Sequence, residues 1–111
     1  MMGDAQLLLA LCAICSLGTS EAFVQRLCAV ESAERRALIV NCVRENFPTP
    51  ELKDRFEERL AEHWGTDELN RAQQICVALA MNPSYQLPQD DMEGYKEGLE
   101  EGMNKCLILA E

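Results

Sequence analysis

The clearest helix signal in this chain reads TPELKDRFEERLAEHWG, residues 49–65. Thr49 is a good N-cap residue, Pro50 suits the first helical position, and Gly65 is typical of the residue that follows a helix. Between them apolar side chains recur at every fourth position, which places them on one face. They are Leu52, Phe56, Leu60 and Trp64. The segment therefore predicts an amphipathic helix from Pro50 to Trp64.

Similar signals lie on both sides of this segment. Ser32 and Thr66 are N-cap residues before apolar-periodic stretches, and Phe47-Pro48 and Asn82-Pro83 end those stretches. Further helices are expected at residues 23–30, 33–46, 67–81 and 89–109. The buried face of the 67–81 helix is expected to contain Leu69, Ala72, Ile75, Cys76 and Leu79. No alternation of polar and apolar residues predicts a strand. The predicted fold is all-α, a small disulfide-stapled bundle of four to five helices.

The last predicted helix divides into an apolar and an acidic face. The apolar face contains Met92, Tyr95, Leu99, Met103 and Cys106. The opposite face contains Asp90, Glu93, Glu97, Glu100 and Glu101. Between them a glycine recurs at every fourth position, at Gly94, Gly98 and Gly102. Each glycine weakens a helix by about 1 kcal/mol relative to alanine, so we expect a neighbouring helix to pack closely there. A ligand groove and self-association are the alternatives.

The N-terminus has the pattern of a secretory leader. An apolar run at residues 7–17 precedes Ser20 and Ala22, and small residues two positions apart are typical of a signal-peptidase site. We therefore expect residues 1–22 to be removed before Phe23. The alternative is a membrane anchor, but the run is too short to cross a hydrocarbon core of about 30 Å. Residues 23–111 are expected to form the secreted, extracellular domain.

Four of the six cysteines lie outside the leader, at Cys28, Cys42, Cys76 and Cys106, each in a different predicted helix. Four cysteines in a short secreted chain predict two disulfides. They allow three pairings, and the sequence does not choose among them.

The charge balance excludes two function classes. Asp4 and Glu21 lie in the leader, so the mature part has 10 basic and 17 acidic residues, a formal charge of −7. Nucleic-acid binding depends on Lys and Arg that neutralise phosphates, and cationic helices bind anionic membranes. We therefore expect no nucleic-acid partner and no stable membrane insertion. We expect the mature chain to be a monomer.

No combination of residues predicts catalysis. His63 is the chain's single histidine, so two-histidine metal sites and Cys/His zinc spacing are absent from the sequence. The cysteines are expected to be in disulfides and are therefore not nucleophiles. We expect a protein that is not an enzyme, with no catalytic residue, no cofactor and no metal ligand.

Several short motifs resemble the microplusin-like antimicrobial proteins of arthropods. They are Leu27-Cys28, Glu34 through Cys42-Val43, Thr49-Pro50-Glu51, Leu87-Pro88-Gln89-Asp90 and Asn104-Lys105-Cys106. The resemblance implies a small, secreted, all-helical host-defence protein. The family pattern has six cysteines, and its better-known members are histidine-rich and associated with copper sequestration. Copper is thus implied by the resemblance alone, and no copper ligand carries over to this chain.

Two other function classes fit the sequence. A carrier of small apolar ligands, similar to insect odorant-binding proteins, would line a pocket with aromatic residues and methionines. The candidates are Phe47, Phe56, Trp64, Tyr85 and Tyr95. A salivary or venom-type effector would instead bind a basic protein partner through an acidic face. The candidate interface for that partner is Glu93, Glu97, Glu100 and Glu101.

Overall fold

The computed structural model describes residues 19–110, which form five α-helices and one short 3-10 helix. The helices are α2 (Thr19–Ala29), α3 (Ala33–Glu45), α4 (Pro50–Trp64), α5 (Glu68–Met81), α6 (Tyr95–Cys106) and η1 (Leu107–Ala110). No strand occurs in this range. The predicted all-α fold is confirmed. The expected leader lies almost entirely outside the described residues.

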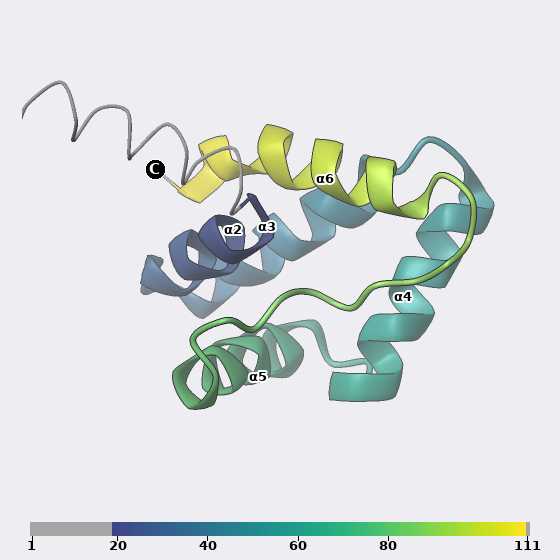
Figure 1. Ribbon diagram of the computed structural model, residues 1–111. Coiled ribbons are helices and arrows are strands. Elements are labelled where there is room, and N and C mark those ends of the chain that lie inside the picture. The colour runs from purple at the N-terminus through teal and green to yellow at the C-terminus, as the bar shows by residue number, and fades with distance from the viewer. Residues whose placement is uncertain (1–18, 111) are drawn as a thin grey trace, which may run out of the picture.

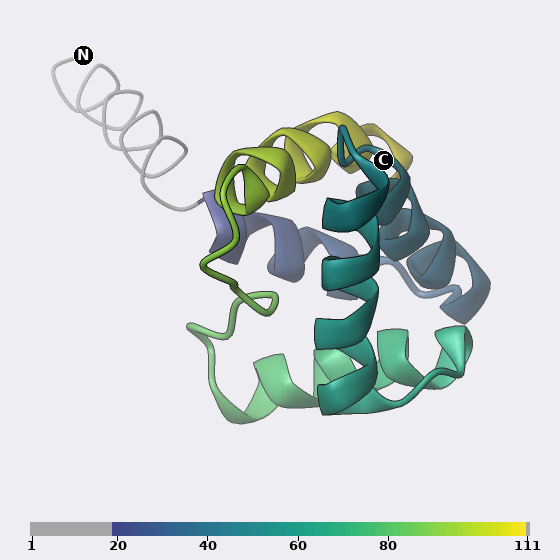
Figure 2. The ribbon, with the colours of Figure 1, turned by 90° about the vertical axis from the view of Figure 1, so that its right-hand side faces the viewer.

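The helices are arranged around a central pair, α2 and α3. Both central helices contact α6 on one side and α5 on the other, as the two views in Figures 1 and 2 show. Helix α4 stands across this arrangement and contacts α3 and α5. The segment between α5 and α6 runs up the left edge of the view in Figure 2, whereas α4 stands in front of the other helices. Every described α-helix therefore packs against at least two others.

The predicted N-caps of α3 and α4 are confirmed, and α3 ends at Glu45, one residue before the expected end. The Ser32 side chain accepts a hydrogen bond from the backbone N–H of Arg35, and the Thr49 side chain accepts one from that of Leu52. Gly65 ends α4 with a φ of 81°, a conformation that glycine adopts without strain. For α5 the N-cap is Asp67, one residue later than expected.

The predicted start of the last helix is wrong. Helix α6 begins at Tyr95, not directly after Pro88, because Gly94 takes a left-handed conformation with a φ of 86°. Asp90 holds the preceding segment by accepting a hydrogen bond from the Met92 N–H at 2.7 Å. The Tyr95 hydroxyl donates to the Pro88 carbonyl at 2.9 Å. Met92, Glu93 and Gly94 therefore lie outside α6.

Three aromatic rings fill the centre of the core. Phe47 follows α3, Phe56 lies on α4 and Tyr95 begins α6. The ring centroid of Phe47 lies 5.2 Å from that of Phe56 and 5.3 Å from that of Tyr95. All three side chains are buried. They pack against one another, so they are core residues and not the lining of an apolar pocket.

The expected close helix contact is confirmed at two of the three glycines. A Cβ atom on Gly98 would lie 2.7 Å from Cδ1 of Phe47. A Cβ atom on Gly102 would lie 3.1 Å from the carbonyl oxygen of Val43. The glycines thus let α6 approach the C-terminal end of α3. Gly94 has the separate role of starting α6.

We predict that Gly98→Ala destabilises the domain by up to about 2 kcal/mol. Overpacking costs about 1–3 kcal/mol and exceeds the gain in helix propensity of about 1 kcal/mol, since Phe47 is held by two other rings. Denaturant unfolding followed by circular dichroism measures the change. The control is Glu101→Ala on the exposed face of α6, which should stay within about 0.5 kcal/mol of wild type. A stabilised Gly98→Ala protein would contradict the close packing.

Candidate functional site

The four cysteines form the two predicted disulfides. Cys28 on α2 pairs with Cys76 on α5, and Cys42 on α3 pairs with Cys106 on α6. Each disulfide thus ties one central helix to one outer helix. The structure therefore selects one of the three pairings that the sequence left open. Helix α4 contains no cysteine and is held by packing and ion pairs.

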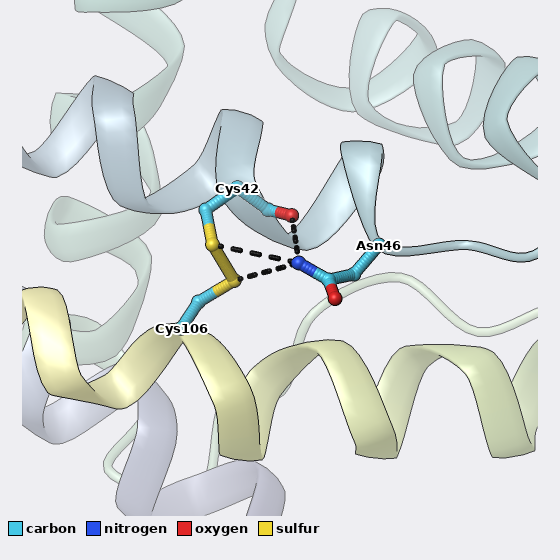
Figure 3. The surroundings of a disulfide bond; sticks show 3 residues. All are labelled: Cys42, Asn46 and Cys106. Carbon is cyan, nitrogen blue, oxygen red and sulfur yellow. Dashed lines mark hydrogen bonds between the residues drawn. A yellow bond between two sulfur atoms is a disulfide. The ribbon is translucent and has the colours of Figure 1, made fainter.

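The two disulfides have different surroundings. Cys106 is fully buried, and the carboxamide of Asn46 lies across its bond to Cys42 (Figure 3). Nδ2 of Asn46 lies 3.6 Å from Sγ of Cys42 and 3.5 Å from Sγ of Cys106, and it donates to the Cys42 carbonyl at 3.0 Å. Cys42 is partly exposed, as are Cys28 and Cys76, but only Cys28 and Cys76 line the surface hollow between α2 and α5.

That hollow has a volume of about 520 Å³ and lies between α2 and α5. It is lined by Gln25, Cys28, Cys76, Leu79, Ala80 and Pro83. A smaller hollow of about 190 Å³ is lined by Arg35, Leu38, Ile108 and Leu109. Neither hollow uses the aromatic residues expected for a carrier. Trp64 and Tyr85 instead form an edge-to-face pair, in which the indole N–H donates to the Tyr85 hydroxyl at 3.2 Å.

The candidate acidic interface is only partly assembled on one helix. Glu97, Glu100 and Glu101 are exposed on α6, whereas Glu93 is exposed in the segment before it. Lys105 lies one turn after Glu101, and its ammonium is 3.5 Å from the Glu101 carboxylate. The surface therefore remains acidic, with one of its carboxylates paired to a lysine.

An ion cluster joins α3, α4 and α5, and the sequence pattern did not predict it. Arg71 on α5 is only 1% exposed, and its two terminal nitrogens bind the two carboxylate oxygens of Glu57 at 2.6 and 2.7 Å. Arg44 on α3 binds the same carboxylate at 2.6 Å. The expected burial of Leu69 is wrong, since it is 45% exposed. Arg71 lies four residues before the buried Ile75, and this spacing is the signal that could have revealed it.

A second ion pair anchors the segment between α5 and α6. The Asp90 side chain is 6% exposed, and its Oδ2 lies 2.8 Å from Nε and 2.6 Å from Nη2 of Arg59. The Met92 N–H and the Arg59 guanidinium lower the pKa of Asp90. The hydrogen bond from Arg71 likewise lowers the pKa of Glu57, against the opposing effect of burial. Both carboxylates are thus stabilised in their charged form.

The lowered pKa values of Asp90 and Glu57 predict that the fold loses stability in acid. A carboxylate whose pKa is lower in the folded state stabilises the fold above its unfolded pKa of about 4, and this contribution disappears as the pH falls through the folded pKa. We expect the thermal midpoint to be nearly constant from pH 7 to 6 and to fall steadily below pH 5. Asp90→Asn should lower the midpoint at pH 7 and flatten this acid dependence. The control is Asp91→Asn, a substitution at the exposed neighbouring carboxylate. Equal acid slopes for Asp90→Asn and wild type would contradict the assignment.

Within residues 19–110, no three His, Cys, Asp or Glu side chains lie close enough to hold a metal ion. Methionine thioethers can also bind Cu(I), but the methionines of this range lie in different environments. Met103 is fully buried and Met81 is 82% exposed. In the same range no helix is both long and apolar enough to span a membrane.

Comparison with known proteins gives no match: no protein-family model, no curated protein and no solved structure matches this chain.

Proposed function

We propose that this chain is a secreted, non-enzymatic host-defence protein with the small helical architecture of the microplusin type. The observation that carries the proposal is the pair of disulfides, each joining a central helix to an outer one. Disulfides of this kind persist in oxidising compartments, which agrees with the leader-like N-terminus. The host-defence role in this proposal is supported by the short motifs that resemble microplusin-like proteins.

The surface supports action by binding a partner. The mature part, residues 23–111, has a formal charge of −7, which disfavours attack on anionic microbial membranes. The exposed carboxylates of Glu97, Glu100 and Glu101 favour a basic partner, because complementary charge accelerates encounter and excludes anionic competitors. We assign the target-binding surface to this face of α6, in a monomeric protein.

The test is growth inhibition of bacteria and fungi by the oxidised mature protein. We expect inhibition by wild type and loss of it in the triple variant E97K/E100K/E101K. The matched control is E31K/D54K/E58K, which makes the same charge change at exposed positions elsewhere. Absence of inhibition by wild type across the panel would refute the defence role. Equal losses in both variants would show an effect of net charge and refute the α6 surface.

Copper sequestration is a separate mechanism for the same role. Calorimetric titration of the mature protein with Cu(I) and Cu(II) tests it directly. Binding tighter than micromolar, together with relief of growth inhibition by added copper, would support sequestration. Weaker binding would exclude it and leave the protein-binding mechanism.

The second candidate function is a carrier of small apolar ligands, and the hollow between α2 and α5 favours it. Its volume of about 520 Å³ lies within the usual range for ligand pockets, and Leu79, Ala80 and Pro83 supply apolar lining. The test is the emission of an apolar fluorescent probe. Leu79→Gln should remove any enhancement, whereas Leu69→Gln, a control outside the hollow, should not. No enhancement with wild type would exclude the carrier.

A further inference from the structure

We propose that the Cys28–Cys76 disulfide is a site of reversible thiol–disulfide exchange, while Cys42–Cys106 is a permanent cross-link. The substrate class is a dithiol, such as the paired thiols of an oxidoreductase. The proposal stands on the different access that the fold allows to the two bonds, and it is independent of the antimicrobial role.

An attacking thiol has access to the Cys28–Cys76 bond. Exchange requires a thiolate to reach one of the two sulfurs, so exposed disulfides react and buried ones are protected. Cys28 and Cys76 are partly exposed and belong to the wall of the hollow of about 520 Å³. Apart from Gln25, the other residues that line this hollow are small or apolar, so the lining places no carboxylate in the path of a thiolate.

The Cys42–Cys106 bond is shielded on two sides. Cys106 is fully buried in the core between α3 and α6. On the other side the carboxamide of Asn46 contacts both sulfurs and is itself fixed by the Cys42 carbonyl (Figure 3). Cys42 is partly exposed, but the Asn46 carboxamide lies against its sulfur and crowds the approach of a thiolate on that side.

The exchange balances as a two-electron transfer. A thiolate of the dithiol attacks one sulfur of the Cys28–Cys76 bond, forms a mixed disulfide and releases the other cysteine as a thiolate, which takes up a proton. The second thiol of the reagent loses its proton and attacks the mixed disulfide. The products are two cysteine thiols and the oxidised disulfide form of the reagent.

The structural consequence is confined to the C-terminal half of α5. The buried residues of α5 are Arg71, Ala72 and Ile75, all of which precede Cys76. The residues from Val77 to Met81 include no buried side chain. Once the bond opens, this half of α5 is no longer tied to α2, and the apolar hollow between them can widen. Helices α3 and α6 remain cross-linked.

The test is partial reduction of the oxidised mature protein with limiting dithiothreitol at neutral pH. Free thiols are trapped at short times with an alkylating reagent and mapped by mass spectrometry. We expect the first product to be alkylated at Cys28 and Cys76 only, with Cys42–Cys106 at least tenfold slower. First alkylation at Cys42 and Cys106 would overturn the proposal. So would loss of both bonds with no singly reduced species.

Two further measurements separate shielding from general stability. Asn46→Ala should accelerate reduction of Cys42–Cys106 several-fold and leave the rate at Cys28–Cys76 unchanged. Hydrogen exchange on the singly reduced protein should show faster exchange at residues 76–81 and unchanged exchange in α4. An unchanged rate of Cys42–Cys106 reduction in Asn46→Ala would overturn the shielding by Asn46. Faster hydrogen exchange throughout the domain would overturn the opening confined to α5.

Discussion

The double substitution C42A/C106A is expected to lower the free energy of unfolding by about 4–6 kcal/mol. This bond joins residues 64 positions apart, and the chain-entropy model gives a loss of about 4 kcal/mol for a loop of that length. Cys106 is also fully buried, so removing its sulfur leaves a small cavity in the core. Small domains have a total stability of about 5–15 kcal/mol, so the loss is a large fraction of it.

The second disulfide supplies a matched comparison. Cys28–Cys76 joins residues 48 positions apart. The chain-entropy model therefore predicts that its removal lowers the free energy of unfolding by an amount within about 0.3 kcal/mol of that for Cys42–Cys106. Since Cys28 and Cys76 are partly exposed, C28A/C76A should leave no comparable cavity. Guanidinium unfolding of both variants measures the difference, which we expect to be about 1–2 kcal/mol. A larger loss in C28A/C76A would contradict the ranking of the two bonds.

Replacing Glu57 by leucine is expected to destabilise the domain by about 3 kcal/mol. Arg71 is 1% exposed, and Glu57 is the acceptor for both of its terminal nitrogens. Without Glu57, Nη1 of Arg71 retains a hydrogen bond to the Gly65 carbonyl, at 3.4 Å. Breaking a buried pair by removing one partner costs about 3–5 kcal/mol, and the partial exposure of Glu57 places this case at the low end.

Replacing the arginine should cost much less than replacing the glutamate. In Arg71→Met, Glu57 keeps its 2.6 Å contact with Arg44 and its access to water. A methionine also fills most of the buried volume of the arginine stem. We expect a loss of about 1 kcal/mol, and we expect E57L/R71M to recover most of the loss seen in Glu57→Leu.

Denaturant unfolding of the two single variants and the double variant gives the coupling free energy. The control is Glu68→Gln, since Glu68 lies 3.6 Å from Arg44 and is about half exposed. It should change stability by less than about 1 kcal/mol. Equal losses for the two single substitutions, additive in the double variant, would show that Arg71 does not depend on Glu57.

Predictions from the sequence succeeded where local contacts decide the structure. Thr49, Pro50 and Gly65 bound α4 as expected, because caps and turns involve residues three or four positions apart. The apolar face of α6 was likewise predicted correctly at Tyr95 and Met103. The burial of Arg71 was not predicted, because an arginine is expected to be exposed unless its partner is known. That partner, Glu57, lies 14 positions away in the sequence.

The start of α6 shows why the remaining features required the tertiary structure. Composition and periodicity allowed a helix directly after Pro88. The left-handed Gly94 and the hydrogen bond that Arg59, 31 positions earlier, donates to Asp90 prevent a helix from starting there. The amino-acid order by itself thus determined the helical class, the boundaries of α3, α4 and α5 to within one residue, and the four cysteines in separate helices. Which cysteines pair, which pair is shielded and which charges are buried were decided by the tertiary structure, since each depends on residues that only the fold brings together.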